Sequence, residues 1–323
     1  MNASLTPVTL DADILQRMMT VSRLIGRLEG INLLKPVPKL RDQNRSRTVH
    51  GSTAIEGNPC TLKDVEDIMR GSPVLVSPSK LLEVRNALAA YDALRDFSPY
   101  EIGSFLRAHA VLMGGGLMLG AGLFRREPVE VYISETETRA MPPWRTVEPR
   151  MRELFSYLAE DADPVLLKSV RFHFECVNLH PFTDGNGRVA RLWQTRLLME
   201  FHPVFEFLDV ESMIYEKRMG YYACIRESQE RGDAAGFVRF MLDRLVETLD
   251  RLWESSGHGI PRRDDRLHTA RVHFGSGSFT RKDYLTLFKT IVAVTASRDL
   301  KAGVDSGALH RQGDNRTTVY QFL

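Results

Sequence analysis

Hydrophobic residues recur every three or four positions through roughly the first 260 residues, and this spacing predicts a mainly helical body. One such segment follows Asp163 and Pro164, where we expect Asp163 to cap a helix and Pro164 to occupy its first turn. Thr61 and Asp64 have the spacing of a capping box, and we expect Gly71 to end the helix that they begin. The apolar positions of two long helices are Leu166, Val170, Phe174 and Val177, then Phe237, Met241, Leu245 and Leu249.

A single stretch between these helical segments alternates apolar and polar residues. Val129, Val131 and Ile133 alternate with Glu130, Tyr132 and Ser134, which is the period of a β-strand. We interpret it as one strand of a hairpin, with residues 135–139 as its polar tip. The prolines that follow Met141 are expected to stop further pairing.

The pattern changes again near residue 255. A run rich in Ser, Gly, Pro and Arg over residues 256–263 predicts a linker, and residues 264–323 predict a separate domain. Thr280 and Asp283 form a second capping box, and residues 295–300 begin another helix with Leu300 and Val304 facing inward. Two β-like runs, 308–312 and 317–322, surround the turn at 313–316. Helix, helix and hairpin are the order of a winged helix-turn-helix.

Composition places the chain among ordinary soluble globular proteins. It has 323 residues, of which 43% are hydrophobic and 26% charged, which excludes collagen, mucin and wholesale disorder. Cys60, Cys176 and Cys224 lie far apart, so neither a disulfide framework nor a cysteine zinc site is expected. The first residues lack the order of a secretory signal, and the most apolar stretch, 110–124, is too short to span a bilayer. We therefore expect a cytoplasmic protein without a membrane partner.

The net charge of +2 hides an asymmetry between the two parts of the chain. Residues 262–323 contain 11 Lys and Arg but 6 Asp and Glu, whereas residues 1–261 contain 32 and 35. A basic tail domain on a mildly acidic body favours a nucleic-acid or acidic-protein partner.

The segment His180–Arg191, HPFTDGNGRVAR, carries the clearest chemistry. Pro181 cannot continue the preceding helix, so we expect a loop from His180 and a new helix from about Arg188. Gly185, Asn186 and Gly187 leave their backbone N–H groups unobstructed at that helix N-terminus, which is the geometry of an anion nest suited to a pyrophosphate.

Three side chains add to this nest. Arg188 can make a planar, bidentate contact with phosphate. Asp184 supplies a hard oxygen for Mg²⁺, which prefers a carboxylate together with phosphate oxygens. His180 has the unperturbed pKa of a general base near neutral pH. Together the residues predict attack of a hydroxyl group on a nucleotide phosphate.

The same residues match the signature HPFx(D/E)GNGRxxR of Fic-domain proteins at every defined position, and the resemblance covers roughly residues 45–250. It implies transfer of AMP from ATP to a hydroxyl of a target protein, with Mg²⁺ and release of pyrophosphate. By this resemblance His180 would deprotonate the hydroxyl, Asp184 would hold Mg²⁺, and Phe182 would anchor the loop in the core. Residues 185–188 would bind phosphates, and Arg191 would bind the γ-phosphate.

Other family features can be carried over with the motif. The hairpin resembles the family's flap, which aligns the target as an added strand, so Val131, Tyr132, Ile133 and Ser134 would line the nucleotide cleft. Tyr221 and Tyr222 resemble the family's adenine-side pair; core aromatic residues are the alternative. Family members often dimerise, and modification of the chain itself is a further expectation.

A kinase subgroup of the superfamily, the Doc-like proteins, has a lysine in the anion loop and transfers the γ-phosphate. Gly187 stands at that position here, which disfavours the kinase.

Ser52, Glu56 and Gly57 form a second motif. Ser52 and Glu56 share one helix face, and Gly57 with the following Asn and Pro ends the helix. A glutamate in a last helical turn opposes the helix dipole, so a tertiary partner would explain it better than local propensity. The segment resembles the inhibitory motif (S/T)xxxE(G/N) of Fic proteins. It implies that Glu56 pairs with Arg191 and occupies the γ-phosphate region; some such proteins also remove AMP with this glutamate.

The sequence thus predicts a mainly α protein with four parts: an N-terminal helical region with an inhibitory helix (1–70), a Fic catalytic core with a hairpin flap (71–255), the linker and a winged-helix domain. Winged helices serve in protein docking or dimerisation as well as in DNA binding, and both roles stay open for that last domain. If it binds DNA, residues of its second helix would face the major groove and wing residues would reach phosphates. These are Thr295, Ser297, Arg298 and Lys301, with Arg311 and Arg316 in the wing. The leading function is an autoinhibited adenylyltransferase, and the alternative is a DNA-binding regulator whose Fic core senses a nucleotide.

Overall fold

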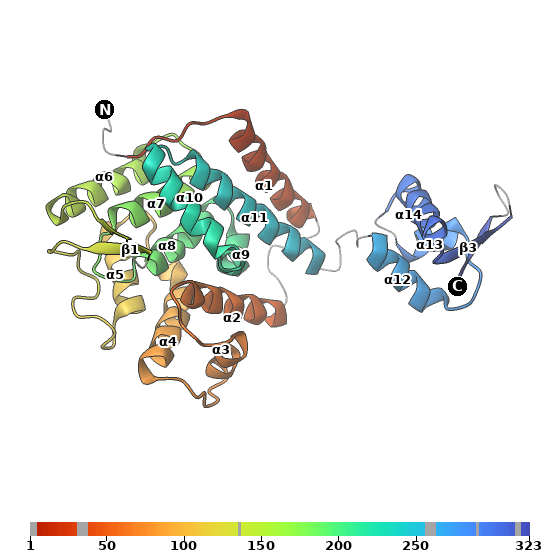
Figure 1. The fold of residues 1–323 in the computed structure, drawn as a ribbon, viewed down its shortest axis with the longest axis horizontal. Helices are drawn as coiled ribbons and strands as arrows, with labels where there is room; N and C mark the ends of the chain where they lie inside the picture. Colours follow the sequence, from red (N-terminus) through yellow and green to blue (C-terminus); the bar gives the residue numbers. More distant parts are fainter. Residues whose placement is uncertain (1–4, 31–37, 135–136, 256–262, 289–290, 314–317) are drawn as a thin grey trace. The chain divides into compact units, whose positions relative to one another are not determined.

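The computed structural model describes residues 5–30, 38–134, 137–255, 263–288, 291–313 and 318–323. The chain folds into two units, unit 1 over Met1–Asp250 and unit 2 over Arg251–Leu323. Both units are predominantly helical (Figure 1). The predicted linker lies almost wholly outside the described residues, and its last residue, Arg263, is the first residue of a helix.

Unit 1 is built from helices interrupted by one hairpin. Its helices are α1 (Ala12–Gly30), α2 (Pro38–Ile55), α3 (Leu62–Met69), α4 (Pro78–Asp92), α5 (Ile102–Met113), α6 (Val147–Glu160), α7 (Val165–Leu179), α8 (Asn186–Phe201), α9 (Val210–Glu216), α10 (Arg218–Arg231) and α11 (Ala235–Ser255), of which α11 runs past the division. Short 3-10 turns are η1 (Leu94–Asp96), η2 (Trp144–Thr146) and η3 (Pro203–Phe207), and the hairpin strands are β1 (Glu130–Ser134) and β2 (Glu137–Ala140).

The core of unit 1 lies around α7 and α8, which pack side by side in the interior (Figure 1). Five aromatic rings meet there at centroid distances of 5.2–6.3 Å, and they come from α5, α6, α7, α8 and the loop before α8. They are Phe105, Phe155, Phe172, Phe182 and Trp193. Burial of such large rings supplies much of the stabilisation of a helical core. The loop before α8 is therefore held against this aromatic cluster through Phe182.

Most sequence-predicted helix signals are confirmed, with small shifts. Thr61 forms the expected capping box, and Gly71 adopts φ +75° just after α3. At α7 the expected cap is wrong by one residue, because Pro164 is the cap and the Asp163 carboxylate instead accepts a hydrogen bond from the Tyr157 hydroxyl at 2.7 Å. The apolar positions expected for α7 and α11 are buried, except that Val177 is only partly so.

The hairpin differs from the expectation at its return strand. Residues 137–140 form β2, with Val131 opposite Arg139 and Tyr132 opposite Thr138. Residues 137–139 therefore do not belong to a polar tip. The β1 pattern alone could not show this, because Glu-Thr-Arg is polar on both faces and carries no alternation.

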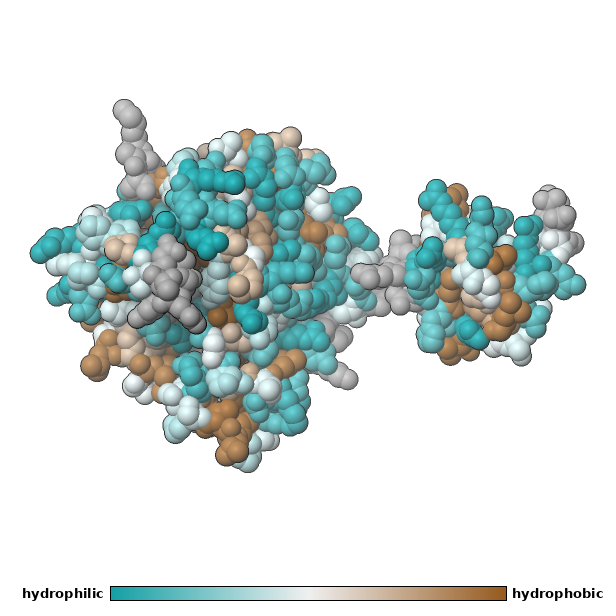
Figure 2. Space-filling view, viewed as in Figure 1, coloured by the Kyte–Doolittle hydropathy of each residue, from teal (hydrophilic) through white to brown (hydrophobic). Residues whose placement is uncertain are grey.

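Exposed apolar side chains gather on two loops of unit 1. Figure 2 shows brown surface over the loop between α3 and α4 and over the loop after α5. Leu75 belongs to the first loop, and Leu119 and Leu123 to the second. In the described part of the chain, no helix combines the length and apolar character needed to cross a membrane.

Unit 2 contains three helices and a strand pair. They are α12 (Arg263–Phe274), α13 (Arg281–Leu287), α14 (Ala293–Asp305), β3 (Leu309–Gln312) and β4 (Val319–Phe322), and the two strands are antiparallel. Thr280 caps α13 with the expected capping box, and Phe279 forms a bridge with Tyr320 of β4. The second predicted helix begins two residues earlier than expected, at Ala293. This order agrees with the prediction for the domain; the name winged helix stays a prediction.

Candidate functional site

His180 stands at the point where α7 ends. It adopts φ 53° and ψ 63° and is the one non-glycine residue with positive φ in the described segments. Such a conformation is rare for a residue with a side chain, and the surroundings must hold it. Arg125 does so, because its Nε donates to the His180 carbonyl at 2.7 Å and its backbone N–H donates to the Pro181 carbonyl at 2.9 Å.

The loop from His180 closes on itself before α8 begins. The Asn186 side chain accepts a hydrogen bond from the Phe182 N–H at 2.8 Å and donates to the Phe182 carbonyl at 2.9 Å. Gly185, with φ +78°, is the cap, so α8 begins at Asn186 and not at about Arg188 as the sequence suggested. The Asn186 amide group is thus committed within the loop, and the backbone N–H groups of the first turn of α8 remain for an anion.

Two rings hold the loop against α5. His109 stacks on Phe182 with centroids 3.5 Å apart, and its Nδ1 accepts the Gly122 N–H at 2.9 Å. The proton is therefore on Nε2, which donates to the Asp184 carbonyl at 2.9 Å. Burial lowers the pKa of His109 to about 4, so the ring stays neutral and keeps this tautomer. Sequence reasoning identified Phe182 but missed His109, because a lone histidine in an apolar helix carries no motif.

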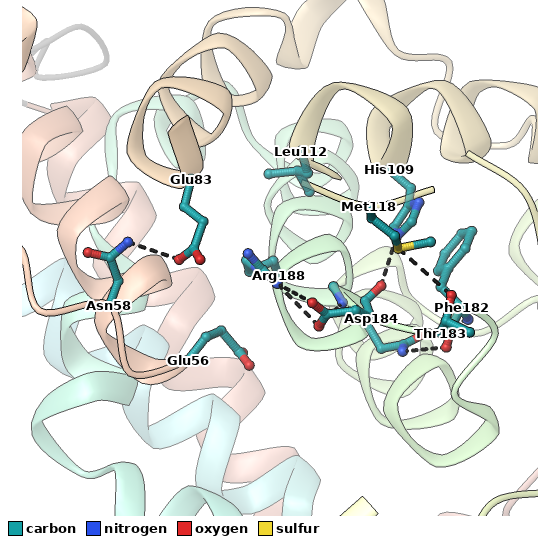
Figure 3. Close-up of polar contacts among 12 residues, drawn as sticks. Glu56, Asn58, Glu83, His109, Leu112, Met118, Phe182, Thr183, Asp184 and Arg188 are labelled. Atoms are coloured by element: carbon teal, nitrogen blue, oxygen red, sulfur yellow. Dashed lines mark hydrogen bonds and ion pairs between the residues drawn. The ribbon is translucent and has the colours of Figure 1, made fainter. Parts of the chain in front are cut away.

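The charged groups of the loop differ in exposure. Burial lowers the pKa of His180 to about 4, although the Val177 carbonyl acts in the opposite direction, so the imidazole is neutral at pH 7. The Asp184 carboxylate is 66% exposed and accepts from Arg188 Nη2 at 3.2 and 3.3 Å (Figure 3). The described residues contain no group of three His, Cys, Asp or Glu that could hold a metal ion. The Asp184 carboxylate therefore stands without a second acidic, His or Cys side chain grouped around it in this part of the chain, and it is accessible to solvent.

Glu56 reaches this loop from α2. It is the first residue after the helix, and Gly57 follows with φ +79°. Arg191 Nη2 donates to the Glu56 carboxylate at 2.7 Å and to the Ser52 carbonyl at 2.9 Å. The expected ion pair is therefore present in the structure.

The same carboxylate lies against the first turn of α8. A Cβ added to Gly187 would stand 2.5 Å from Glu56 Oε1 and 3.0 Å from Arg191 Nη1. Only a glycine leaves room for this approach. Burial disfavours the charge of Arg191, but Glu56, together with Tyr221 and Tyr91, raises the pKa of the guanidinium above its ordinary value. Glu56 thus puts a negative charge where the helix N-terminus favours an anion.

The helix that precedes Glu56, α2, is fixed to the neighbouring helix α9. Gly51 packs so closely on α9 that an added Cβ would stand 2.7 Å from the Glu211 backbone. The Tyr91 hydroxyl donates to Glu211 Oε1 at 2.6 Å, and Thr195 does so at 3.2 Å. Burial raises the pKa of Glu211 to about 7. Sequence reasoning missed this set, because its members come from four separate helices.

Asn58 fixes the turn after Glu56. Its Nδ2 donates to Glu83 Oε2 at 2.9 Å and to the Lys80 carbonyl at 3.1 Å, which ties the turn to α4 (Figure 3).

Of the four hairpin residues predicted to line the nucleotide cleft, the structure describes the side chain of one. Val131 is partly buried, and the side chains of Tyr132, Ile133 and Ser134 lie outside the described part of the structure. Strand β2 is tied to α10, because Arg139 donates to Gln229, whose amide donates to Asn178 at 3.1 Å.

Of the two tyrosines, only Tyr222 is near the surface. Tyr221 is 1% exposed and shares a 2.9 Å hydrogen bond with His173, so the alternative, a core aromatic residue, describes it better. A nucleotide base cannot contact a side chain that its neighbours cover completely. Tyr222 is 45% exposed, and its hydroxyl donates to the Ile55 carbonyl at 3.0 Å, directly beside Glu56.

The predicted nucleic-acid residues gather in unit 2. Ser297, Arg298 and Lys301 line one hollow of about 320 Å³ on α14, together with Arg281 of α13. Thr295 is partly buried, Arg311 is exposed on β3, and Arg316 lies outside the described residues. This surface belongs to unit 2, whereas the loop 180–188 belongs to unit 1.

Comparison with known proteins agrees with the motif. Residues 99–198 match the Fic/DOC family. A crystal structure of a Fic family protein from Desulfovibrio desulfuricans is 31% identical, with 98% of each chain covered and a TM-score of 0.73. The chain is 28% identical over 216 residues to the protein adenylyltransferase Fic of Nematostella vectensis and 27% identical over 219 residues to that named fic-1 of Caenorhabditis elegans. The matches cover 62% and 63% of this chain but less than half of those curated relatives, 47% and 40%.

Proposed function

Because the chain belongs to the Fic family, we propose that it is a protein adenylyltransferase, which transfers AMP from ATP to a hydroxyl side chain of a target protein. The observation that carries the proposal is the loop 180–188, where a neutral histidine, an exposed carboxylate and free N–H groups of a helix N-terminus converge. The names of the two curated relatives support the same reaction.

In this reaction His180 is the general base. Its imidazole is neutral at pH 7 and so can accept the proton of the target hydroxyl. The hydroxyl oxygen then forms a bond to the α-phosphorus of ATP, and the bond from that phosphorus to the β-phosphate oxygen breaks. Pyrophosphate leaves with its electron pair, and the proton remains on His180.

The first turn of α8 binds the phosphates. Its N–H groups and the absence of a side chain at Gly187 allow a close approach of anionic oxygen, and Arg188 adds a cation beside them. Asp184 is the carboxylate that would hold Mg²⁺, which neutralises phosphate charge when bound. Asp184 pairs with Arg188, so both groups lie close to the proposed phosphate position.

Glu56 restrains the reaction. Its carboxylate occupies the space beside Gly187 and neutralises Arg191, the residue that we assign to the γ-phosphate. Two anions cannot share this space without strong repulsion. ATP therefore binds productively only when Glu56 moves away, and Glu56→Gly should raise the rate. The target lies along the hairpin as an added strand.

The proposal is tested by measuring which phosphate of ATP, the α or the γ, is transferred to protein. Wild type, Glu56→Gly and Glu56→Gly/His180→Ala are incubated with Mg²⁺, a cell extract as the source of acceptors, and ATP labelled at the α- or the γ-phosphate. We expect label from α-labelled ATP only, increased by Glu56→Gly and lost with His180→Ala. Label from the γ-phosphate would identify a kinase, and absence of both labels would favour a function without transfer.

A second function rests on unit 2. Arg298 and Lys301 are exposed on α14, whereas Asp299 between them turns inward to Arg266, so residues 293–301 present no acidic side chain to solvent. This face supports the alternative of a DNA-binding regulator. Fluorescence anisotropy with labelled duplex DNA at several salt concentrations tests it. Binding that weakens with salt and is lost in Arg298→Ala/Lys301→Ala supports a regulatory role, whereas equal binding by the Asp305→Ala control and the double variant argues against it.

A further inference from the structure

A groove on unit 1 lies beside the base of the hairpin. Its volume is about 590 Å³, and its walls come from α5, the loop 123–126, η2 and α6. The apolar side chains that line it are Ile102, Leu106, Leu123, Phe124 and Trp144. An apolar hollow of this kind on the surface of a protein is typical of a ligand or partner site.

The groove adjoins the catalytic loop. The Phe124 ring, which lines the groove, contacts Phe182 at a centroid distance of 5.6 Å. Arg125 also lines it and donates to the carbonyls of His180 and Pro142. Trp144 follows the end of β2 by four residues, so it lies at most about 14 Å along the chain from the hairpin. A polypeptide bound to the hairpin can therefore enter the groove a few residues away from the reacting hydroxyl.

The charges at the rim indicate what the groove accepts. Among the described residues, Arg126 and Arg145 have no carboxylate partner, and Arg145 instead lies 4.5 Å from the centre of the Trp144 ring. Arg152 is different, since it pairs with Glu148 at 2.7 Å and is already neutralised. Arg125 also has no carboxylate partner in the described part of the chain, but it is buried and its guanidinium is bonded to backbone carbonyls. The exposed charges that remain uncompensated, those of Arg126 and Arg145, are both positive, and each guanidinium can make a bidentate contact with a carboxylate.

We propose that this groove docks a segment of the target protein in which an apolar or aromatic side chain stands beside aspartate or glutamate. The apolar side chain enters between Leu106, Phe124 and Trp144, and the carboxylates pair with Arg126 and Arg145. The inference rests on the proposed adenylyltransferase function and adds the chemistry by which a target is chosen. Because the docking segment is separate from the acceptor residue, it selects the target independently of the hydroxyl that is modified.

The test uses two series of peptides that each contain one Ser, Thr or Tyr. In the first series a Phe flanked by two Asp is placed about three to eight residues from the hydroxyl on either side, a range set by the reach of the chain. In the second series Asn replaces each Asp. AMP transfer is measured with Glu56→Gly protein, and binding of the same peptides is measured separately by fluorescence anisotropy.

We expect the Asp series to be modified about tenfold more efficiently than the Asn series at one spacing, and the double variant Arg126→Glu/Arg145→Glu to abolish that ratio. The matched control is Arg23→Glu/Arg85→Glu, which reverses two exposed arginines on α1 and α4 that likewise have no carboxylate partner among the described residues, and it should keep the ratio. Trp144→Ala should weaken binding of both series. Equal rates for the two series at every spacing, or an unchanged ratio in the double variant, would overturn the docking proposal.

The two readouts separate this inference from the proposed function. Charge-dependent binding without AMP transfer would leave the groove as a docking site and refute the transferase. AMP transfer without any preference for the Asp peptides would support the transferase and refute the docking site. A change in sedimentation coefficient on Arg126→Glu/Arg145→Glu, with no charge preference, would mean that a second copy of the chain covers the groove.

Discussion

Two buried arginines, one in each unit, are paired with a carboxylate in different ways. In unit 2, Arg266 and Asp299 are 6% and 4% exposed and make two bonds, at 2.6 and 2.7 Å. In unit 1, Arg191 is 1% exposed, but Glu56 is 31% exposed and receives a single bond at 2.7 Å. The first carboxylate is enclosed on all sides, whereas the second can leave towards solvent.

The difference in geometry matches a difference in role. A bidentate pair with both partners buried cannot open without leaving an unpaired charge in the interior, so it holds structure. A pair with one exposed partner can exchange that partner for another anion, because Arg191 also donates to the Ser52 carbonyl, a bond that does not involve Glu56. We infer that the Arg266–Asp299 pair stabilises a domain and that the Arg191–Glu56 pair acts as a displaceable brake.

The largest expected effect concerns His180, the proposed general base, in the protein from which the inhibitory Glu56 has been removed. Replacing His180 by Ala in the Glu56→Gly protein should lower the rate of AMP transfer about 10²–10⁴-fold, because the change removes the proposed general base. His268→Ala, an exposed histidine of unit 2, is the control and should leave the rate unchanged. Rates are measured from protein-bound label over time. A double variant that retains the rate of Glu56→Gly would exclude His180 as the base.

The next effect concerns the structural pair. Asp299→Ala should destabilise unit 2 by about 3–5 kcal/mol, because Arg266 would remain buried without a counter-charge. Hydrogen exchange of backbone amides in residues 263–305, read by mass spectrometry, measures this loss of protection. Asp305→Ala, at the exposed end of the same helix, should have little effect. Equal exchange in both variants would show that the pair contributes nothing to stability.

A smaller effect concerns the neutral histidines near the brake. Burial lowers the pKa values of His109, His173 and His180 to about 4, 3 and 4, whereas the unfolded chain titrates near 6.5. The unfolded state therefore binds more protons below pH 6.5, and stability falls as the pH falls from 6.5 towards 4. Glu211, with its pKa raised to about 7, opposes the trend, since the stability that it contributes is lost as the pH rises from 4.5 through 7.

Because three histidines lower the stability on acidification and only Glu211 raises it, the free energy of unfolding should decrease as the pH falls. Each histidine contributes on the order of 1–2 kcal/mol between pH 7 and pH 5. Urea titrations at pH 7, 6 and 5 measure the change, and His109→Gln should reduce the slope. Equal unfolding free energies at pH 7 and pH 5 would contradict the burial of neutral imidazoles.

The smallest effect tests how closely Glu56 approaches α8. Gly187→Ala should destabilise the wild type by about 1 kcal/mol, because the new methyl group meets the Glu56 carboxylate. In Glu56→Gly the same change should be less unfavourable, since alanine favours a helix and that contact is gone. The free energies of the four proteins form a double-mutant cycle. If the effects of Gly187→Ala and Glu56→Gly on the unfolding free energy are additive, the Glu56 carboxylate does not contact residue 187.

The features that could be predicted from the sequence are those that depend on neighbouring residues along the chain, such as helix ends and capping boxes. Pro181 and the glycines of the loop predicted where α7 ends and where an anion could bind, and Thr61 and Thr280 predicted two capping boxes that the structure confirms. The Glu56–Arg191 contact was predicted only through resemblance to a family, because 135 residues separate its partners.

What the sequence did not predict depends on tertiary packing. The return strand of the hairpin has no alternation, and burial of Tyr221 depends on neighbours from other helices. Arg125 and His109 hold the loop through bonds across 55 and 75 residues, and neither has a local signature. The arginine-rimmed groove likewise exists only once α5, η2 and α6 come together.

The most direct test of the brake compares wild type, Glu56→Gly and Asp299→Ala in one experiment, with protein-bound label from α-labelled ATP as the readout. The account predicts at least about a tenfold increase for Glu56→Gly, equivalent to roughly 1.4 kcal/mol in activation free energy, and no increase for Asp299→Ala. Equal amounts of protein-bound label with wild type and Glu56→Gly would contradict the account. The Glu56 carboxylate beside Gly187 would then not limit productive binding of ATP.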